Sequence, residues 1–340
     1  MIRPDLAALP SYVPGKRQPD ALKLSSNEVA TAPLPAAVEA MTEAARNANR
    51  YPDMFATDLR LALAEHLELA PEQVAVGCGS SALCQQLVQI TAGPGDEVIF
   101  AWRSFEAYPI FAQIVGATPV PVPLLPDGRH DLDTMADSIT ERTRLMFLCN
   151  PNNPSGAVIT ETEFHAFMAR VPQDVLVGLD EAYFEYNRAD DTVIGTEAIA
   201  QYPNVVGLRT FSKAYGLAGV RVGYAFGPAA IIAALNKVCI PFGVSAVAQA
   251  GAVASLGSAD ELLERTEETV AQRDRVAAAL GTHRSQANFV WLPGVDSLEI
   301  AERLATQGVL VRAFPEGVRI TVTTEDEADQ LLAAWEKVGL

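Results

Sequence analysis

Short apolar runs alternate with segments of helical periodicity through the middle of the chain. A short continuous apolar run predicts a buried strand, and apolar residues spaced three or four apart predict an amphipathic helix. The predicted strands are 74–79, 97–102, 118–123, 144–149, 175–180, 204–211 and 222–227. The predicted helices between them include 57–67, 81–91 and 160–171. This alternation is typical of an α/β fold, so we expect a large domain with a mostly parallel seven-stranded sheet and helices on both faces.

The pattern changes after the last of these strands. Long helical stretches there lead into short strand candidates at 288–292 and 318–324 and then into a final helix. The start of the chain is rich in proline and weakly periodic, which is typical of an arm that packs across another domain or a partner subunit. We therefore expect a large α/β domain at 31–245. The N-terminal arm, 1–30, and residues 246–340 together are predicted to form a smaller α+β domain.

Composition and charge narrow the classes of function. The 340 residues carry a formal charge of −17, with 25 Lys and Arg against 42 Asp and Glu. A nucleic-acid-binding surface needs an excess of basic residues, so we expect no nucleic-acid partner. No apolar stretch is long enough to cross a membrane, and the N-terminus lacks the apolar region of a signal peptide. The cysteines lack metal-ligand spacing and the histidines are scattered, which predicts a cytoplasmic protein without a metal site.

A lysine in a turn rich in serine and glycine is the strongest chemical candidate. The segment 210–227 reads TFSKAYGLAGVRVGYAFG, in which Ser212 and Lys213 follow a predicted strand and Arg221 comes a few residues later. A lysine amine removed from water becomes reactive toward a carbonyl carbon, and an arginine grips phosphate through a planar fork of donors. Taken alone, the segment favours a surface lysine and a structural arginine, because most lysines are solvated.

Three further segments place polar residues where predicted strands end. Asp180 and Tyr183 lie in VGLDEAYFEY, Asn153 lies in CNPNNPSG, and Ser80 and Ser81 lie in GCGSSALCQQLVQI. Ligand-binding groups collect at the carboxyl ends of strands in open α/β sheets, and backbone N–H groups at a helix start bind anions. A helix-capping Asp, a rigid Asn–Pro turn and an ordinary serine cap are the alternative interpretations. The four segments in this order favour one shared site over four coincidences.

These motifs resemble those of the fold-type-I aminotransferases that use pyridoxal 5'-phosphate (PLP), in the histidinol-phosphate aminotransferase-like branch. The resemblance covers nearly the whole chain and includes GSS, NPNNPSG, DEAY, SKAYGLAGVRVGY, the NRYPD segment and the closing VRITV. Within that branch, WRSFEAY at 102–108 and SQANFVWLP at 285–293 look most like the actinobacterial aromatic (phenylalanine) aminotransferases. The resemblance implies an enzyme that moves an amino group between phenylalanine- or tyrosine-type amino acids and 2-oxo acids.

The resemblance also implies a role toward PLP for each matching residue. Lys213 would carry the cofactor as a Schiff base and transfer the proton of the substrate α-carbon. Asp180 would pair with the pyridinium nitrogen, and Tyr108 would stack on the ring. Asn153 and Tyr183 would contact the phenolic oxygen. The residues implied to hold the phosphate are Ser80, Ser81, Ser212 and Arg221.

Other residues would serve the substrate and the assembly. Tyr51, in NRYPD, would reach the phosphate from the second subunit, which implies a homodimer. Arg319 would bind the substrate α-carboxylate. Tyr12, Asn27 and Arg312 would line the substrate pocket.

Three other functions share parts of this pattern. A histidinol-phosphate aminotransferase is one, because Arg312 and Arg319 together would suit a phosphorylated substrate; Glu316 nearby adds an acid and no further base, which favours a carboxylate. A threonine-phosphate decarboxylase would share the scaffold and release CO₂. A PLP-binding sensor of a transcription regulator would carry a basic DNA-binding segment, and this acidic chain lacks that electrostatic pattern. Of the four functions, we predict the aromatic aminotransferase.

Overall fold

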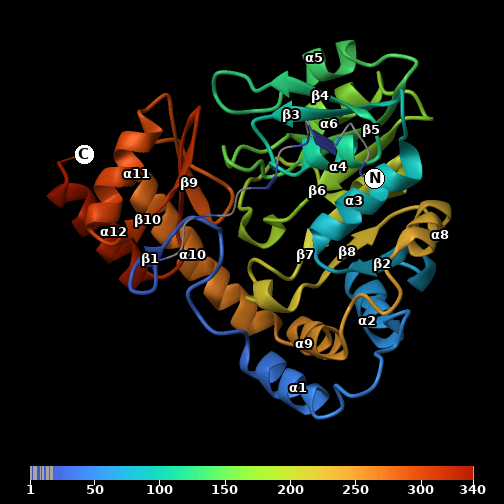
Figure 1. The fold of residues 1–340 in the computed structure, drawn as a ribbon, viewed down its shortest axis with the longest axis horizontal. Helices are drawn as coiled ribbons and strands as arrows, with labels where there is room; N and C mark the ends of the chain where they lie inside the picture. The colour runs from blue at the N-terminus through green and yellow to red at the C-terminus, as the bar shows by residue number, and fades with distance from the viewer. Residues whose placement is uncertain are drawn as a thin grey trace.

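The computed structural model describes residues 18–339 together with residues 2, 6, 7, 9, 11, 12 and 15. Figure 1 shows a large body built on a central sheet and a smaller lobe that contains the C-terminus. Most of the first half of the predicted arm lies outside the described residues. Within the described part of the chain, no helix is long and apolar enough to span a membrane.

A mixed sheet of seven strands forms the centre of the large body in the part of the chain that the structure describes. The strands are β2 (Val74–Gly77), β3 (Glu97–Trp102), β4 (Thr118–Pro123), β5 (Thr143–Cys149), β6 (Leu176–Asp180), β7 (Val205–Thr210) and β8 (Gly223–Phe226). Their order is β2-β8-β7-β6-β5-β3-β4, and β8 runs antiparallel to its neighbours β2 and β7. The predicted α/β fold with a mostly parallel seven-stranded sheet is confirmed.

Helices cover both faces of this sheet. They are α1 (Pro35–Ala45), α2 (Thr57–Leu67), α3 (Ser80–Thr91), α4 (Tyr108–Ile114), α5 (Leu132–Asp137), α6 (Glu161–Met168), α7 (Gly195–Gln201), α8 (Ala229–Val238) and α9 (Ala246–Leu256). One face packs on α3, α4 and α8, and the other packs on α5, α6 and α7. Phe147 and Met146 of β5 are therefore both fully buried, on opposite faces. Burial on both faces explains the near-continuous apolar runs of the sequence.

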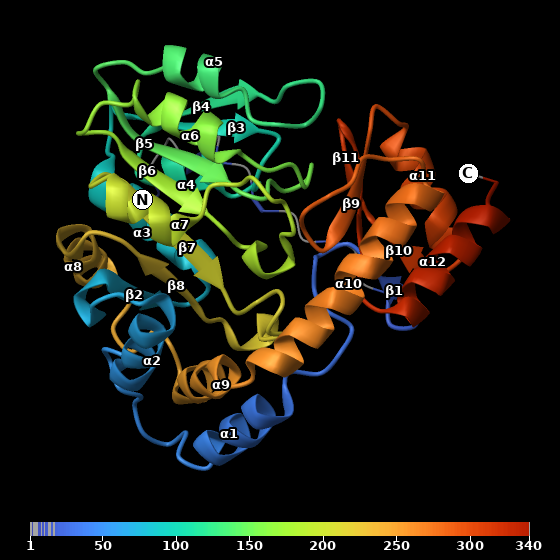
Figure 2. The ribbon, with the colours of Figure 1, turned by 180° about the vertical axis from the view of Figure 1, so that it is seen from behind.

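The smaller lobe is built mainly from the last quarter of the chain. Its elements are α10 (Ala259–Ala279), β9 (Phe289–Pro293), α11 (Ser297–Thr306), β10 (Val309–Leu310), β11 (Arg312–Phe314), β12 (Gly317–Thr321) and α12 (Glu325–Lys337). An antiparallel sheet in the order β11-β12-β9 packs on these helices, and β1 (Leu22–Lys23) pairs in parallel with β10. A segment near the N-terminus thus joins the lobe, while α10 runs from α9 into it (Figure 2).

The packing of α9 bears on the division into domains. Ala248 and Ala252 of α9 are buried in a cluster with Leu34, which directly precedes α1, and with Leu59 and Leu63 of α2. This helix therefore contacts the large body, although it follows the predicted boundary at 245. The division of the chain at that residue stays a prediction.

Candidate active site

A cavity of about 710 Å³ lies where the large body meets the smaller lobe. Cys149, Asp180 and Thr210, the last residues of β5, β6 and β7, line it from the large body. These strands are parallel, so their carboxyl ends meet at one edge of the sheet, where open α/β folds bind ligands. The predicted site residues that line this cavity are Tyr12, Asn27, Ser80, Ser81, Asn153, Asp180, Tyr183, Ser212, Lys213, Arg221, Arg312 and Arg319. Tyr51 and Tyr108 do not line it.

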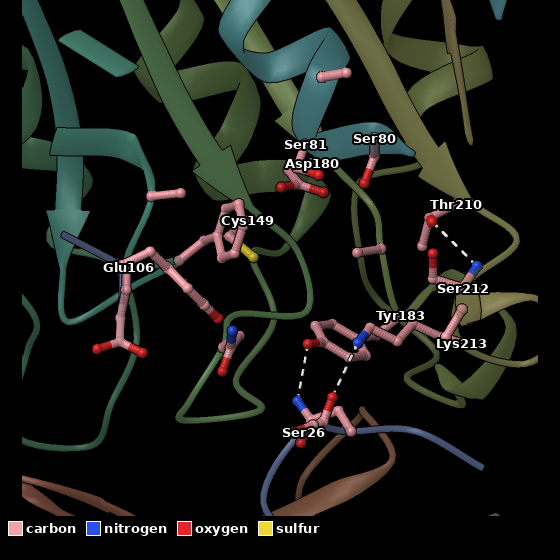
Figure 3. A pocket seen from close by; sticks show the side chains of 18 of the residues that line it. Ser26, Ser80, Ser81, Glu106, Cys149, Asp180, Tyr183, Thr210, Ser212 and Lys213 are labelled. Carbon is pink, nitrogen blue, oxygen red and sulfur yellow. Dashed lines mark hydrogen bonds between the residues drawn. The ribbon is translucent and has the colours of Figure 1, made fainter. Parts of the chain in front are cut away.

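Asp180 presents an unsatisfied carboxylate oxygen at this cavity (Figure 3). Its side chain is buried, and its Oδ2 accepts a hydrogen bond from the Tyr108 hydroxyl at 2.6 Å. Among the residues that the structure describes, its Oδ1 has no hydrogen-bond partner. Burial raises the pKa of Asp180 to about 6. A buried acceptor without a donor costs free energy, so a ligand that brings a protonated nitrogen to Oδ1 would bind favourably.

Tyr108 lies behind the cavity, which corrects its predicted role. It begins α4 and is fully buried, with its ring stacked on Phe147 at a centroid distance of 4.4 Å. Its hydroxyl points to Asp180. A ring held in this way does not stack on a ligand in the cavity. Phe105, which meets Tyr108 edge to face and which the sequence reasoning missed, does line the cavity.

Lys213 lies in the turn that follows β7. Its Nζ donates a hydrogen bond to the backbone carbonyl of Ser26 at 3.3 Å, shown as a dashed line in Figure 3. Burial lowers the pKa of Lys213 to about 8, and the positive charge of Arg319 acts in the same direction. A fraction of the amine is therefore unprotonated near neutral pH, as a nucleophile that attacks a carbonyl carbon must be.

Arg221 and the start of α3 form a cradle of donors. The Arg221 guanidinium donates to the hydroxyl oxygens of Ser212 at 3.2 Å and Ser81 at 3.4 Å. A Cβ atom added at Gly223 would lie 2.4 Å from the backbone nitrogen of Ser80, so only glycine leaves this helix start open. Hydroxyl groups, backbone N–H groups and one guanidinium around one space suit a phosphate.

On the side of the cavity formed by the smaller lobe, Arg319 connects the lobe to the large body. This buried residue of β12 donates to Asn153 Oδ1 at 2.6 Å and to the carbonyl of Ser25 at 2.7 Å, while its Nε has no partner. Asn153 therefore keeps its amide NH₂ group for a ligand. Asn27 donates to the Tyr183 hydroxyl at 2.9 Å, which leaves the hydroxyl hydrogen of Tyr183 to donate in turn. Burial raises the pKa of Tyr183, so it stays protonated.

Arg312 and Tyr12 also line the cavity, and Arg312 contacts a further residue there. Arg312 Nη2 donates to Glu106 Oε2 at 2.7 Å, and both side chains line the cavity. Tyr12 lines it with about half of its side chain exposed. Glu106 was missed in the sequence, although an acid within the aromatic segment WRSFEAY directly after a strand was a usable signal.

Tyr51 lies away from these residues. It is 82% exposed, and its ring stacks on Phe242 at 4.7 Å. The structure therefore does not bring Tyr51 to the cavity of its own chain. Among the residues that the structure describes, no three His, Cys, Asp or Glu side chains come together as a metal site.

The residues present fit PLP on three observations. The unpartnered oxygen of Asp180 suits a protonated ring nitrogen. The cradle at Arg221, kept open by Gly223, suits the phosphate. Lys213, which lines the same cavity and has a lowered pKa, is an amine suited to react with the aldehyde.

Comparison with known proteins supports this interpretation. The family described as aminotransferase class I and II matches residues 19–334. An aromatic amino acid aminotransferase of Corynebacterium efficiens is 69% identical, over 99% of this chain and 99% of its own length. Another, of Rhodococcus jostii, is 56% identical over 97% of this chain and 94% of its own. The crystal structure of histidinol-phosphate aminotransferase from Sinorhizobium meliloti in complex with PLP is 30% identical, with a TM-score of 0.89 over 99% of this chain and 97% of the other.

Proposed function

This chain belongs to the class I and II aminotransferases, and from that premise we propose that it moves amino groups between aromatic amino acids and 2-oxo acids. It is a PLP-dependent aminotransferase. The observation that carries the aromatic specificity is the 69% identity, along almost the full length, to the Corynebacterium efficiens enzyme of that name. The cavity supports it, because Phe105, Ile110 and Phe111 give it an apolar wall that suits an aromatic ring.

The proposed chemistry centres on Lys213 and Asp180. When bound, PLP supplies a carbon that combines with the substrate amine and a ring that withdraws electrons from the α-carbon. Lys213 Nζ would take the proton from the substrate α-carbon and deliver it to the cofactor carbon that is bonded to the substrate nitrogen, and its pKa of about 8 suits both transfers near neutral pH. Asp180 holds a proton at the ring nitrogen through its Oδ1. The hydrogen bond from Tyr108 fixes the orientation of that carboxylate.

The remaining site residues hold and orient the reactants. Asn153 and Tyr183 donate to the phenolic oxygen of the cofactor. Arg319 binds the substrate α-carboxylate, and its unpartnered Nε is a donor that the protein itself does not use. The residues proposed to hold the phosphate are Ser80, Ser81, Ser212 and Arg221, all of which line the cavity.

A phosphorylated substrate is the second candidate, because the Sinorhizobium meliloti neighbour is a histidinol-phosphate aminotransferase. The charges near the cavity weigh against it. Arg312 is paired with Glu106 at 2.7 Å, and Arg103 is paired with Glu316 at 2.9 Å. Arginines that already carry a carboxylate partner are poor receptors for a phosphate dianion.

The test is steady-state kinetics of the holoenzyme with a common 2-oxo acid acceptor. We expect kcat/KM for phenylalanine and tyrosine to exceed that for histidinol phosphate at least about tenfold, a difference that one or two pocket contacts provide. The reverse order would assign the chain to the histidinol-phosphate enzymes. Release of CO₂ from threonine phosphate, without formation of a 2-oxo acid, would assign it to the decarboxylases.

We further propose that the enzyme is a homodimer in which Tyr51 completes the site of the partner. Ile240 lines the cavity and is nevertheless 72% exposed, while Tyr51 is 82% and Phe55 61% exposed. A second copy that covers these apolar side chains would close this wall of the cavity. The four cysteines are free, which suits the reducing conditions of the proposed location, the cytoplasm.

Mixed dimers test the contribution of Tyr51. Lys213→Ala and Tyr51→Ala chains are each expected to be nearly inactive alone. In a mixed dimer, the Tyr51→Ala chain supplies an intact Lys213 and the Lys213→Ala chain supplies an intact Tyr51 to the same site. Equal mixing should therefore restore about a quarter of the wild-type activity. If Tyr51 acts within its own chain, no activity returns.

A further inference from the structure

Glu106 and Arg312 form an ion pair inside the active-site cavity. Glu106 lies in the loop between β3 and α4, and Arg312 lies on β11, opposite Arg319 of β12 in the strand register. The side chain of Arg312 is 13% exposed and that of Glu106 28%. Because the pair is largely shielded from water, its charges act on a neighbouring ligand more strongly than charges at an open surface.

The pair lies at the end of the cavity that remains for the substrate side chain. The proposed phosphate cradle includes Ser212, and the reactive amine is that of Lys213. Figure 3 shows Glu106 on the opposite side of the cavity from both of them. Arg319, beside Arg312, is assigned to the α-carboxylate. A side chain that extends past Arg319 therefore meets the Glu106–Arg312 pair.

We propose that Glu106 is a specificity-determining residue: by pairing with Arg312, it makes this end of the cavity select uncharged aromatic side chains over side chains that end in a phosphate or carboxylate. The inference rests on the proposed aromatic function. Without Glu106, Arg312 and Arg319 on adjacent strands would present two positive charges, a good receptor for a substrate with two anionic groups. With Glu106 in place, the positive charge of Arg312 is balanced, and the Glu106 carboxylate repels a second anionic group of the substrate.

A second ion pair between the same two segments provides a matched control. Arg103 donates through Nε and Nη2 to the two carboxylate oxygens of Glu316, both at 2.9 Å. Like the first pair, it joins the segment after β3 to the β11–β12 hairpin, but neither of its residues lines the cavity. Glu316→Gln therefore removes the same charge from the same contact region without changing the wall of the cavity.

The experiment measures equilibrium binding of two unreactive ligands to the holoenzyme by calorimetry. Phenylpropionate and its para-carboxylate derivative both lack an amino group, and they differ by one negative charge at the far end of the ring. We expect Glu106→Gln to strengthen binding of the dianion relative to the monoanion at least about tenfold, the size of one partly buried charge contact. Glu316→Gln should leave this ratio within about twofold of wild type, because this pair does not line the cavity and its carboxylate is 44% exposed, so that solvent and salt screen its charge from the ligand.

Two additional variants separate specificity from damage to the fold. Glu106→Asp keeps the charge and should keep the wild-type ratio. The double variant Glu106→Gln with Arg312→Gln should return the ratio toward wild type, because the cation that attracts the dianion is then gone. An unchanged ratio in Glu106→Gln, or an equal change in Glu316→Gln, would overturn the inference. Failure of the wild-type enzyme to bind phenylpropionate at all would instead overturn the proposed aromatic function.

Discussion

Replacing Asp180 with Asn should stabilise the cofactor-free protein while it removes function. Asp180 is 4% exposed, its Oδ1 has no partner, and burial raises its pKa from an ordinary value of 3.8 to about 6. Each pKa unit corresponds to about 1.4 kcal/mol, so the ionised carboxylate opposes folding by about 3 kcal/mol. Asn has nearly the same shape and still accepts the hydrogen bond from Tyr108, but it carries no charge to bury.

The pH dependence of this gain in stability follows from the direction of the pKa shift of Asp180. The pKa of Asp180 is higher in the folded than in the unfolded protein, so the cost of the charge is complete above pH 6 and disappears below pH 3.8. We therefore expect the cofactor-free Asp180→Asn variant to exceed wild type in free energy of unfolding by about 3 kcal/mol at pH 8 and by about half of that at pH 5.

Urea unfolding of the cofactor-free proteins at both pH values measures this difference. Asp190→Asn, which changes an exposed carboxylate, is the control and should alter the free energy of unfolding by less than about 0.5 kcal/mol. Added PLP should reverse the order, because a ligand stabilises the form that binds it more tightly. A cofactor-free Asp180→Asn variant that is no more stable than wild type at pH 8, or a gain that does not depend on pH, would show that the buried charge of Asp180 does not oppose folding.

Three further predictions concern the same site. Lys213→Ala should abolish transamination while the circular dichroism spectrum stays that of wild type; retained turnover would contradict the role of the amine. Gly223→Ala, whose Cβ would lie 2.4 Å from the Ser80 nitrogen, should weaken PLP affinity, measured by fluorescence titration, at least about tenfold. The control Gly219→Ala, whose Cβ would have no atom within 4 Å, should leave PLP affinity unchanged. In the cofactor-free protein, an amine-selective reagent should label Lys213 with a midpoint near pH 8. Arg319→Gln should move this midpoint upward, because the positive charge that lowers the pKa of Lys213 is lost. A midpoint that does not change in Arg319→Gln would exclude this electrostatic effect of Arg319 on Lys213.

The central sheet was predictable because six of its seven described strands are buried along nearly their whole length; only Val122 is buried in the edge strand β4. Near-continuous apolar runs located all seven strands of the described sheet, and the strand ends at Cys149, Asp180 and Thr210 then meet at one edge by topology alone. That edge brings Asn153, which follows β5, near the residues that follow β6 and β7. The core of the site was thus implied by local patterns.

Contacts between distant segments were not predictable in the same way. The pairing of Glu106 with Arg312 and the hydrogen bond from Arg319 to Asn153 depend on how the smaller lobe lies against the large body. Neither partner carries a local signal of the other. The packing of α9 on α1 and α2 depends on the same tertiary arrangement.

The predicted stacking role of Tyr108 was wrong for a local reason. Phe105 and Tyr108 both occur in the segment after β3, and the sequence does not say which of them faces the cavity. The start of α4 at Tyr108 decides it, because this position directs the ring into the sheet against Phe147 and the hydroxyl toward Asp180. Phe105, in the preceding loop, is left at the cavity wall.

PLP-dependent transamination of aromatic amino acids is tested most simply by the visible absorption of the purified holoenzyme as phenylalanine, tyrosine, histidinol phosphate and glutamate are added separately. We expect a yellow protein whose cofactor band decays to that of pyridoxamine phosphate, with phenylalanine and tyrosine reacting far faster than histidinol phosphate. A colourless protein that PLP does not reconstitute would contradict the role of Lys213. A yellow protein that reacts fastest with histidinol phosphate would contradict the aromatic specificity.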